Sequence, residues 1–267
     1  MDALIEEVAS ALRGARRVVA LTGAGVSAES GIATFREAVH GAAAGAGTMA
    51  ALWAEFDPMK LATPEAFAAD PAAVSRWYDR RRLGCLAAAP NPGHVALAEL
   101  ERLLESRGGR LTLLTQNVDR LHQKAGSRNV VELHGNIITW RCTRTGRQVE
   151  PPAEGFAEFP AKSPFDAEGL LRPDVVWFGE MLPPAALAAA EEALSACDAF
   201  VSIGTSSVVY PAAGFVRMAA MRGAATAEVN AEETAASGIV DVTVRGRSGD
   251  VLPKVVGLLA GRETRGG

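Results

Sequence analysis

The stretch LTGAGVSAESGIATFR, residues 21–36, joins a short apolar run to a loop with three glycines. Within it, residues 23–28 match the pattern G-x-G-x-x-G/A. Glycines in that pattern permit a tight turn after a strand and a close approach of the backbone to a pyrophosphate, and the next helix directs its first N–H groups at that charge. A plain strand-to-helix turn would also use glycines here, so the pattern alone leaves that alternative open.

Short apolar runs alternate with longer Ala/Leu-rich segments along most of the chain. RVVALT (17–22) and AFVSIGT (199–205) have the length of strands, whereas HVALAELERLLESRG (94–108) has helical spacing. Such alternation is typical of a parallel sheet with helices on both faces. We therefore expect a doubly wound, Rossmann-like α/β core, formed by residues 1–37, 92–135 and 172–267.

Two stretches interrupt the alternation, and both are assigned to a smaller inserted domain. Residues 38–91 contain the helical segments WAEFDPMKLATPEAF and PAAVSRWYDRRRLGCL with no strand between them. Residues 136–171 contain ITWRCTRTGRQV, which predicts a hairpin, followed by a loop-like stretch. The second insertion has little apolar content, so we expect it to lean on the first.

The composition argues against several classes of partner. The 267 residues are 48% hydrophobic and carry a net charge of −4, with Lys and Arg scattered, which disfavours nucleic acid and anionic membranes. No apolar run approaches the roughly 20 residues that span a bilayer, and the acidic N-terminal segment is unlike a targeting peptide. The widely spaced Cys85, Cys142 and Cys197 fit a reducing compartment, so a cytoplasmic location is expected.

Polar residues follow several predicted strands. TQNVD (115–119), ELHG (132–135) and IGTSS (203–207) each come directly after an apolar run, and AEVN ends at Asn230. Because the carboxyl ends of strands in an open α/β sheet face one crevice, we expect these segments to converge. The usual dinucleotide fold places an acid after its second strand to hold the adenosine ribose. None is present there, and the Asn230 amide is our candidate for that role.

The motifs GAGVS, GIATFR, TQNVD, ELHG, RPDVVWFGE, IGTSS and EVN, in this order, resemble the sirtuin family of NAD-dependent protein-lysine deacylases. TQNVD together with ELHG is specific, unlike the glycine pattern. The resemblance implies that the acyl oxygen of a modified lysine attacks the ribose carbon that bears nicotinamide, after which the acyl group migrates to the sugar. Free lysine, nicotinamide and O-acyl-ADP-ribose would be released, and the partners would be acylated-lysine proteins or peptides.

The resemblance also implies roles for the motif residues. Asn117 would be catalytic, and Asp119 would accept a hydrogen bond from the nicotinamide carboxamide. A helix N-cap before residues 120–126 is the structural alternative for Asp119. The residues expected to bind NAD are Gly23, Ala24, Gly25, Phe35, Arg36, Gln116, Asn117, Asp119, Gly204, Thr205, Ser206, Asn230 and Ser248.

His134 is the candidate general base. Of the four histidines it alone closes a predicted strand, since His40 lies in a Gly/Ala loop and His94 and His122 belong to helical segments. An imidazole with a pKa of about 6.5 suits proton removal at neutral pH. A histidine at a strand end is otherwise more often structural, and the ELHG motif favours the catalytic role, in which His134 draws a proton through the ribose hydroxyls.

Two segments are expected to bind the acylated lysine. Val176, Trp177, Phe178 and Gly179 would line its channel and offer an edge for the substrate peptide, although a plain core strand would read the same. Tyr78 and Arg81 match the Y-x-x-R pattern of sirtuins that remove succinyl, malonyl or glutaryl groups.

In that setting the guanidinium would meet the acyl carboxylate with two parallel N–H bonds, and the Tyr78 hydroxyl would donate a third. The alternative is a solvated basic face against which Tyr78 merely packs, formed by Arg76, Arg80, Arg81 and Arg82.

The sequence departs from the family at its metal module. The family usually carries two C-x-x-C pairs, whereas this chain has only Cys142, with Thr145 at the partner position. A structural zinc site needs four Cys or His ligands, so we expect no metal. Packing against the helical insertion would take its place, by Ile137, Ile138, Trp140 and Val149.

Other activities on the same fold stay open. A mono-ADP-ribosyltransferase would transfer ADP-ribose to protein, and an NAD sensor would bind without turnover. A hydride-transferring dehydrogenase is a more distant alternative. Intact TQNVD and ELHG favour turnover, because a binding module needs no His134 base.

Overall fold

The computed structural model describes residues 1–32 and 58–261, and its central strand is the one that precedes the glycine loop. β1 (Arg17–Thr22) pairs in parallel with β2 (Arg110–Thr115) on one side and β7 (Ala199–Ile203) on the other. Every residue of β1 after Arg17 is buried, as in strands covered on both faces. The described sheet has six strands in the order β3-β2-β1-β7-β8-β9, with β3 at Val130–Glu132, β8 at Ala225–Asn230 and β9 at Val242–Arg245.

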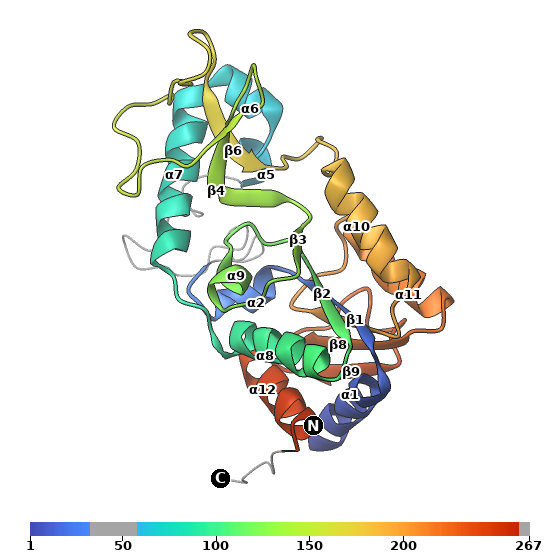
Figure 1. Cartoon of the computed structure of the whole chain (residues 1–267). Helices are drawn as coiled ribbons and strands as arrows, with labels where there is room; N and C mark the ends of the chain where they lie inside the picture. Colours follow the sequence, from blue (N-terminus) through green and yellow to red (C-terminus); the bar gives the residue numbers. More distant parts are fainter. Residues whose placement is uncertain (33–57, 262–267) are drawn as a thin grey trace.

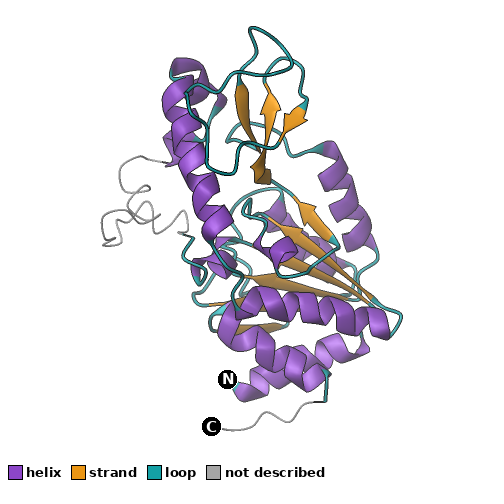
Figure 2. Cartoon of the chain, turned by 60° about the vertical axis from the view of Figure 1, so that its left-hand side comes forward, coloured by secondary structure: helices purple, strands orange, loops and turns teal. Residues whose placement is uncertain are grey.

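Helices cover both faces of this sheet (Figures 1 and 2). α1 (Asp2–Gly14), α8 (Pro92–Ser106) and α12 (Ser248–Leu259) share one apolar cluster with Val18 and Ala20 of β1. The other face packs on α10 (Pro184–Ser195), the 3-10 turn η1 (Ala212–Gly214) and α11 (Phe215–Met221). The predicted doubly wound core is confirmed. None of the described helices is long and apolar enough to cross a bilayer.

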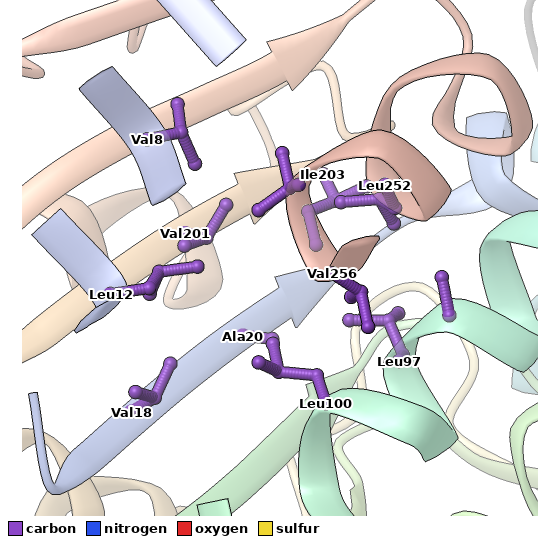
Figure 3. Close-up of a pocket in the computed structure, with 12 residues that line it drawn as sticks. Val8, Leu12, Val18, Ala20, Leu97, Leu100, Val201, Ile203, Leu252 and Val256 are labelled. Atoms are coloured by element: carbon purple, nitrogen blue, oxygen red, sulfur yellow. The ribbon is translucent and has the colours of Figure 1, made fainter. Parts of the chain in front are cut away.

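Figure 3 shows a pocket inside the first of these layers. Only apolar side chains line it, among them Val8, Leu97, Val201 and Leu252. A nucleotide needs hydrogen-bond partners, and a buried polar ligand without them would lose several kcal/mol, roughly 2–7 for each polar group. This pocket is therefore part of the hydrophobic core and not a nucleotide site.

The smaller domain combines helices with an antiparallel sheet. α5 (Pro58–Leu61), α6 (Pro64–Ala69) and α7 (Pro71–Ala87) precede the core helix α8. β4 (Gly135–Cys142) and β5 (Gln148–Val149) form the predicted hairpin, and β6 (Leu171–Val175) pairs antiparallel with β4. Figure 1 shows these helices and strands side by side, away from α1 and α12.

Local sequence explains where the helices of this domain begin. The Thr63 hydroxyl accepts from the Ala66 N–H at 3.1 Å, and an Asp70 carboxylate oxygen accepts from the Ala73 N–H at 2.9 Å. Each of these caps is followed by a proline, whose fixed φ and missing N–H suit the first helical position.

The two insertions share one core, as predicted. Trp140 and Ile137 of β4 are fully buried in a cluster with Trp77 and Tyr78 of α7, and Ile138 and Val149 pack at its margin. The predicted boundary at residue 172 falls inside β6, because β6 pairs with β4 and supplies Leu171 and Val175 to this cluster. A strand as short as LRPDV does not show by its sequence which of two sheets it joins. We place the return to the core at α10.

Candidate active site

The glycine loop lies against the turn that follows β7. The Gly23 N–H donates to the Ile203 carbonyl at 3.1 Å, and the Gly25 N–H donates to the Gly204 carbonyl at 2.8 Å. A Cβ at Gly23 would lie 2.7 Å from Thr205 Cβ, and one at Gly25 would lie 2.8 Å from the Gly204 oxygen. The glycines are thus required for the close approach of two loops at the point where the strand order reverses, which is where such folds bind ligands.

The strand-end motifs converge at this point, as expected. The Gln116 amide donates to Thr205 Oγ1 at 2.9 Å, and the Asn230 amide donates to the Thr205 carbonyl at 2.8 Å. The Asn117 amide donates to the Gly23 carbonyl at 3.0 Å. Segments far apart in the sequence therefore meet around Gly23 and Thr205, where each of the three amide side chains donates a hydrogen bond.

Asp119 has both structural and site contacts. One carboxylate oxygen accepts from the Leu121 N–H at 2.8 Å at the start of α9 (Leu121–Lys124), although the N-cap residue of that helix is Arg120 and not Asp119. The other accepts from the Ser27 hydroxyl at 2.8 Å. Burial raises the pKa of Asp119, although these hydrogen bonds and the charge of Arg81 oppose the shift.

Ser27 contacts two of the candidate site residues, although the sequence patterns above did not single it out. It lies in α2 (Ala24–Ala28), directly after the glycine loop, and its hydroxyl links Asn117 to Asp119 by accepting from the Asn117 amide at 3.0 Å. Ser27 is the last residue of the GAGVS motif, and this position could have marked it as a candidate site residue.

His134 has a fixed orientation at the end of β3. Its Nδ1 lies 3.0 Å from the Gln116 carbonyl. A carbonyl only accepts, so Nδ1 carries the proton and Nε2 of the neutral ring is bare. Burial lowers the pKa of His134, and the bond to Gln116 opposes this. Gly135, with φ of +69°, follows it, and a Cβ there would lie 2.0 Å from the Asp174 oxygen, so only glycine fits.

Tyr78 and Arg81 lie together on the inner side of α7. Tyr78 is 1% exposed and Arg81 is 7% exposed, and the Arg81 guanidinium carbon lies 5.4 Å from the centre of the Tyr78 ring. Burial raises the pKa of Tyr78 to about 12, so its hydroxyl keeps its proton. Burial lowers the pKa of Arg81, whose charge acts on Asp119.

The alternative of a solvated basic face is therefore wrong for half of its members. Arg76 and Arg80 are exposed, whereas Arg81 and Arg82 are buried. Arg82 pairs with Asp79 at 2.7 Å and donates to the Pro152 carbonyl at 2.8 Å, and Asp79 accepts from the Phe156 N–H at 3.0 Å. This buried pair joins α7 to the loop that follows the hairpin.

The predicted channel segment runs from beside His134 into the smaller domain. The Val176 N–H donates to the His134 carbonyl at 2.9 Å, and the Phe178 N–H donates to the Ala62 carbonyl at 2.9 Å. Trp177 is buried, with its ring 6.1 Å from that of Tyr78. Val176 is half-buried, whereas Phe178 and Gly179 are exposed.

Glu180 holds this segment in place. It pairs with Arg172 at 2.6 Å and accepts from the Trp177 N–H at 2.8 Å, and the Arg172 guanidinium lies 3.3 Å from the centre of the Trp177 ring. Although burial raises the pKa of Glu180, the hydrogen bonds from Arg172 and Trp177 outweigh it, and the pKa is lowered.

The remaining predicted site residues differ in what the structure shows of them. The Ser248 hydroxyl donates to Glu29 at 2.9 Å and is thus engaged within the protein. Ala24 is the first residue of α2, Gly204 lies in the turn after β7, and Ser206 is half-buried beyond Thr205. Phe35, Arg36 and His40 lie outside the described residues.

The metal module offers little for a metal to bind. Within residues 1–32 and 58–261, no group of three or more His, Cys, Asp and Glu side chains could hold an ion. Burial raises the pKa of Cys142, but hydrogen bonds from Ser163, from Thr145 and from the backbone lower it to about 7. One sulfur does not fit a structural zinc site.

A two-domain α/β protein with polar groups at its topological switch point is the class that this fold and site define. Residues 23–211 match the model of the Sir2 family. The chain is 49% identical over 251 residues to the NAD-dependent protein deacylase 2 of Pyrobaculum aerophilum, covering 93% of each protein.

Two solved structures agree with this match. One is a Sir2 homologue in complex with NAD, with a TM-score of 0.85, 41% identity, and coverage of 96% of this chain and 94% of that one. The other is a mutant Sir2 homologue in complex with 2′-O-acetyl ADP ribose, with a TM-score of 0.84, 43% identity and 96% of each chain covered. The chain belongs to the Sir2 family.

Proposed function

We propose that this chain is an NAD-dependent protein-lysine deacylase that prefers acidic acyl groups over acetyl. The observation that carries the proposal is the two-residue link between the base and the buried pair on α7. The Val176 N–H bonds to the His134 carbonyl, and the next residue, Trp177, packs beside Tyr78. A modified lysine that follows this segment would have its acyl group near Tyr78 and Arg81 and the reacting carbon near His134.

The polar groups around Gly23 and Thr205 fit NAD. Backbone packs closely there because glycines replace side chains, and Asn230 and Thr205 supply hydrogen bonds for the adenosine half. We assign Gln116 and Asn117 to the nicotinamide side. Each oxygen of Asp119 accepts one protein hydrogen bond, which leaves lone pairs for a carboxamide NH₂. NAD supplies the ribose carbon from which nicotinamide departs, as the names of the relatives and the bound ligands of the solved structures support.

His134 is proposed as the base that accepts a proton from a ribose hydroxyl at Nε2. Its Nδ1–H bond to Gln116 fixes the tautomer, and its lowered pKa keeps the ring neutral at neutral pH. The same carbonyl would then stabilise the imidazolium until the proton leaves.

The acidic preference rests on Tyr78 and Arg81. A guanidinium can meet a carboxylate with two parallel N–H bonds, and the protonated Tyr78 hydroxyl can donate another. β6 is an edge strand of its sheet, which supports binding of an extended peptide by strand addition beside residues 175–179.

Mass spectrometry of NAD incubated with one peptide sequence, carrying acetyl-lysine or succinyl-lysine, tests the proposal. We expect nicotinamide and O-acyl-ADP-ribose only when the acyl peptide is present, and neither with His134→Ala. ADP-ribose attached to protein would identify the transferase alternative, and NAD that is bound but not consumed would identify a sensor.

A further inference from the structure

A buried row of polar side chains lies behind Asn117. Thr22 ends β1 and Thr115 ends β2, and the two are register partners in the sheet. The Thr22 hydroxyl donates to Thr115 Oγ1 at 2.9 Å, and His122 Nε2 lies 3.0 Å from Thr22 Oγ1. None of the three is more than 2% exposed. Buried polar groups are costly unless they are paired, so this row has a defined arrangement of donors and acceptors.

The row ends on the backbone of the catalytic loop. Thr115 Oγ1 also accepts from the Asn117 N–H at 3.1 Å, and the Gln116 N–H donates to the Thr22 carbonyl at 3.0 Å. Two successive N–H groups of the loop are therefore fixed by Thr22 and Thr115. This loop carries Gln116, Asn117 and Asp119.

The orientation of the Thr22 hydroxyl assigns the proton on His122. With its single proton directed at Thr115 Oγ1, the Thr22 oxygen accepts from His122, which places the ring proton on Nε2. In the reverse arrangement Thr115 donates to Thr22 and Thr22 donates to His122 Nε2, which puts the ring proton on Nδ1, an atom without a hydrogen-bond partner among the described residues.

The surroundings of His122 favour the neutral ring. His94 of α8 lies against it with ring centres 4.7 Å apart, and His94 Nδ1 accepts from the Asn91 N–H. Burial and the neighbouring His94 hold the pKa of His122 well below its ordinary value. Asp119, three residues earlier in the sequence, accepts hydrogen bonds at its two oxygens from Ser27 and Leu121.

We infer that His122 and Thr22 are positioning residues of the active site, which hold the Thr115 hydroxyl so that it sets the backbone of Asn117. Neither residue touches substrate in this arrangement. They act through Thr115, and the side chains of the 116–119 loop keep their directions because the row behind the loop is complete. The effect on turnover rests on the proposed function, whereas the arrangement itself does not.

Matched substitutions at Thr22 separate positioning from packing. Thr22→Val keeps the shape and removes the hydroxyl, whereas Thr22→Ser keeps the hydroxyl. Thr22→Val is expected to lower kcat roughly five- to tenfold, the size of one hydrogen bond between neutral groups, with the KM for acyl peptide little changed. Thr22→Ser should retain kcat within about twofold, because its hydroxyl can still bridge His122 and Thr115.

A second substitution tests whether the row acts as a unit. His122→Phe should lower kcat by a similar factor, and the double variant with Thr22→Val should lose no more than either single variant, because both interrupt one row. Additive losses would overturn the inference. So would a lower melting temperature of Thr22→Val with unchanged kcat.

Nuclear magnetic resonance decides the arrangement without turnover. At neutral pH the ring nitrogen shifts of His122 should show the proton on Nε2, and the Asn117 amide signal should move in Thr22→Val but not in Thr22→Ser. A proton on Nδ1, or an Asn117 signal that does not move, would overturn the inference. Absence of turnover of any acyl peptide would refute the proposed function. The spectra would still decide whether Thr22 and His122 position the Asn117 backbone, because they do not depend on turnover.

Discussion

Replacement of Arg81 by methionine is the sharpest perturbation of the proposed acyl selectivity. The side chain is 7% exposed on α7 beside Tyr78, so water screens its charge little. Hydrogen bonds between charged partners are worth on the order of 1.5–3 kcal/mol. At about 1.4 kcal/mol for each factor of ten, the unmodified protein should favour a succinyl over an acetyl peptide by about 10- to 100-fold in kcat/KM.

Arg81→Met should remove most of that advantage while deacetylation changes little, because a neutral acetyl group forms no ion pair. Arg80→Met is the matched control, since Arg80 lies one residue earlier on the same helix and is exposed. Both variants are measured with one peptide sequence carrying either acyl group, by release of nicotinamide. Equal or better activity of the unmodified protein on the acetyl peptide would refute the reasoning, as would a selectivity loss in Arg80→Met equal to that in Arg81→Met.

Four further expectations concern other parts of the molecule. The pKa of His134 is lowered by burial, so the acid limb of a kcat/KM profile should fall below pH 6.5, and a midpoint above that value would contradict the assigned environment. Burial lowers the pKa of His94 to about 4 and that of His122 well below 6.5. As the pH falls, these histidines therefore bind protons in the unfolded chain before they do so in the folded one. The unfolding free energy measured with urea should decrease below about pH 6.5, by up to about 1.4 kcal/mol per pH unit for each histidine. Arg82→Met leaves the buried Asp79 carboxylate without its cation and should lower that free energy by about 3–5 kcal/mol, whereas Arg80→Met should not. Metal analysis of the untagged protein should find zinc well below one equivalent, with no change of melting temperature on addition of a chelator.

Gly25→Ala completes the set, because its Cβ would lie 2.8 Å from a backbone oxygen of Gly204. Calorimetry should show weaker NAD binding and a lower melting temperature, whereas Gly14→Ala, with open space around the added methyl group, should show neither. Unchanged NAD affinity in Gly25→Ala would mean that the two loops separate without cost.

The core and the meeting of its motifs were predictable because each depends on local pattern. β1 contains a continuous apolar run, which predicts a buried strand. Because parallel strands end at one crevice, the contacts of Gln116 and Asn230 with Thr205 could also be expected. The pairing partner of β6 was not predictable, since LRPDV, a strand of five residues with mixed polarity, could extend either sheet. The burial of Arg81 and Arg82 was not predictable either, because the sequence RWYDRRR is equally compatible with guanidinium groups that face water. In the structure the Arg81 guanidinium lies 4.6 Å from the centre of the Trp77 ring.

Neighbouring side chains of α7 make different contacts, and this makes the helix suitable for engineering. Tyr78 and Arg81, the pair proposed to meet the acyl carboxylate, lie together on this helix, whereas Asp79 and Arg82 bind the loop at Pro152 and Phe156. The residues proposed for recognition thus alternate along one helix with those that anchor it, and no side chain belongs to both sets. A designer could exchange residues 78 and 81 to accept other acyl groups and leave the anchor of the domain untouched.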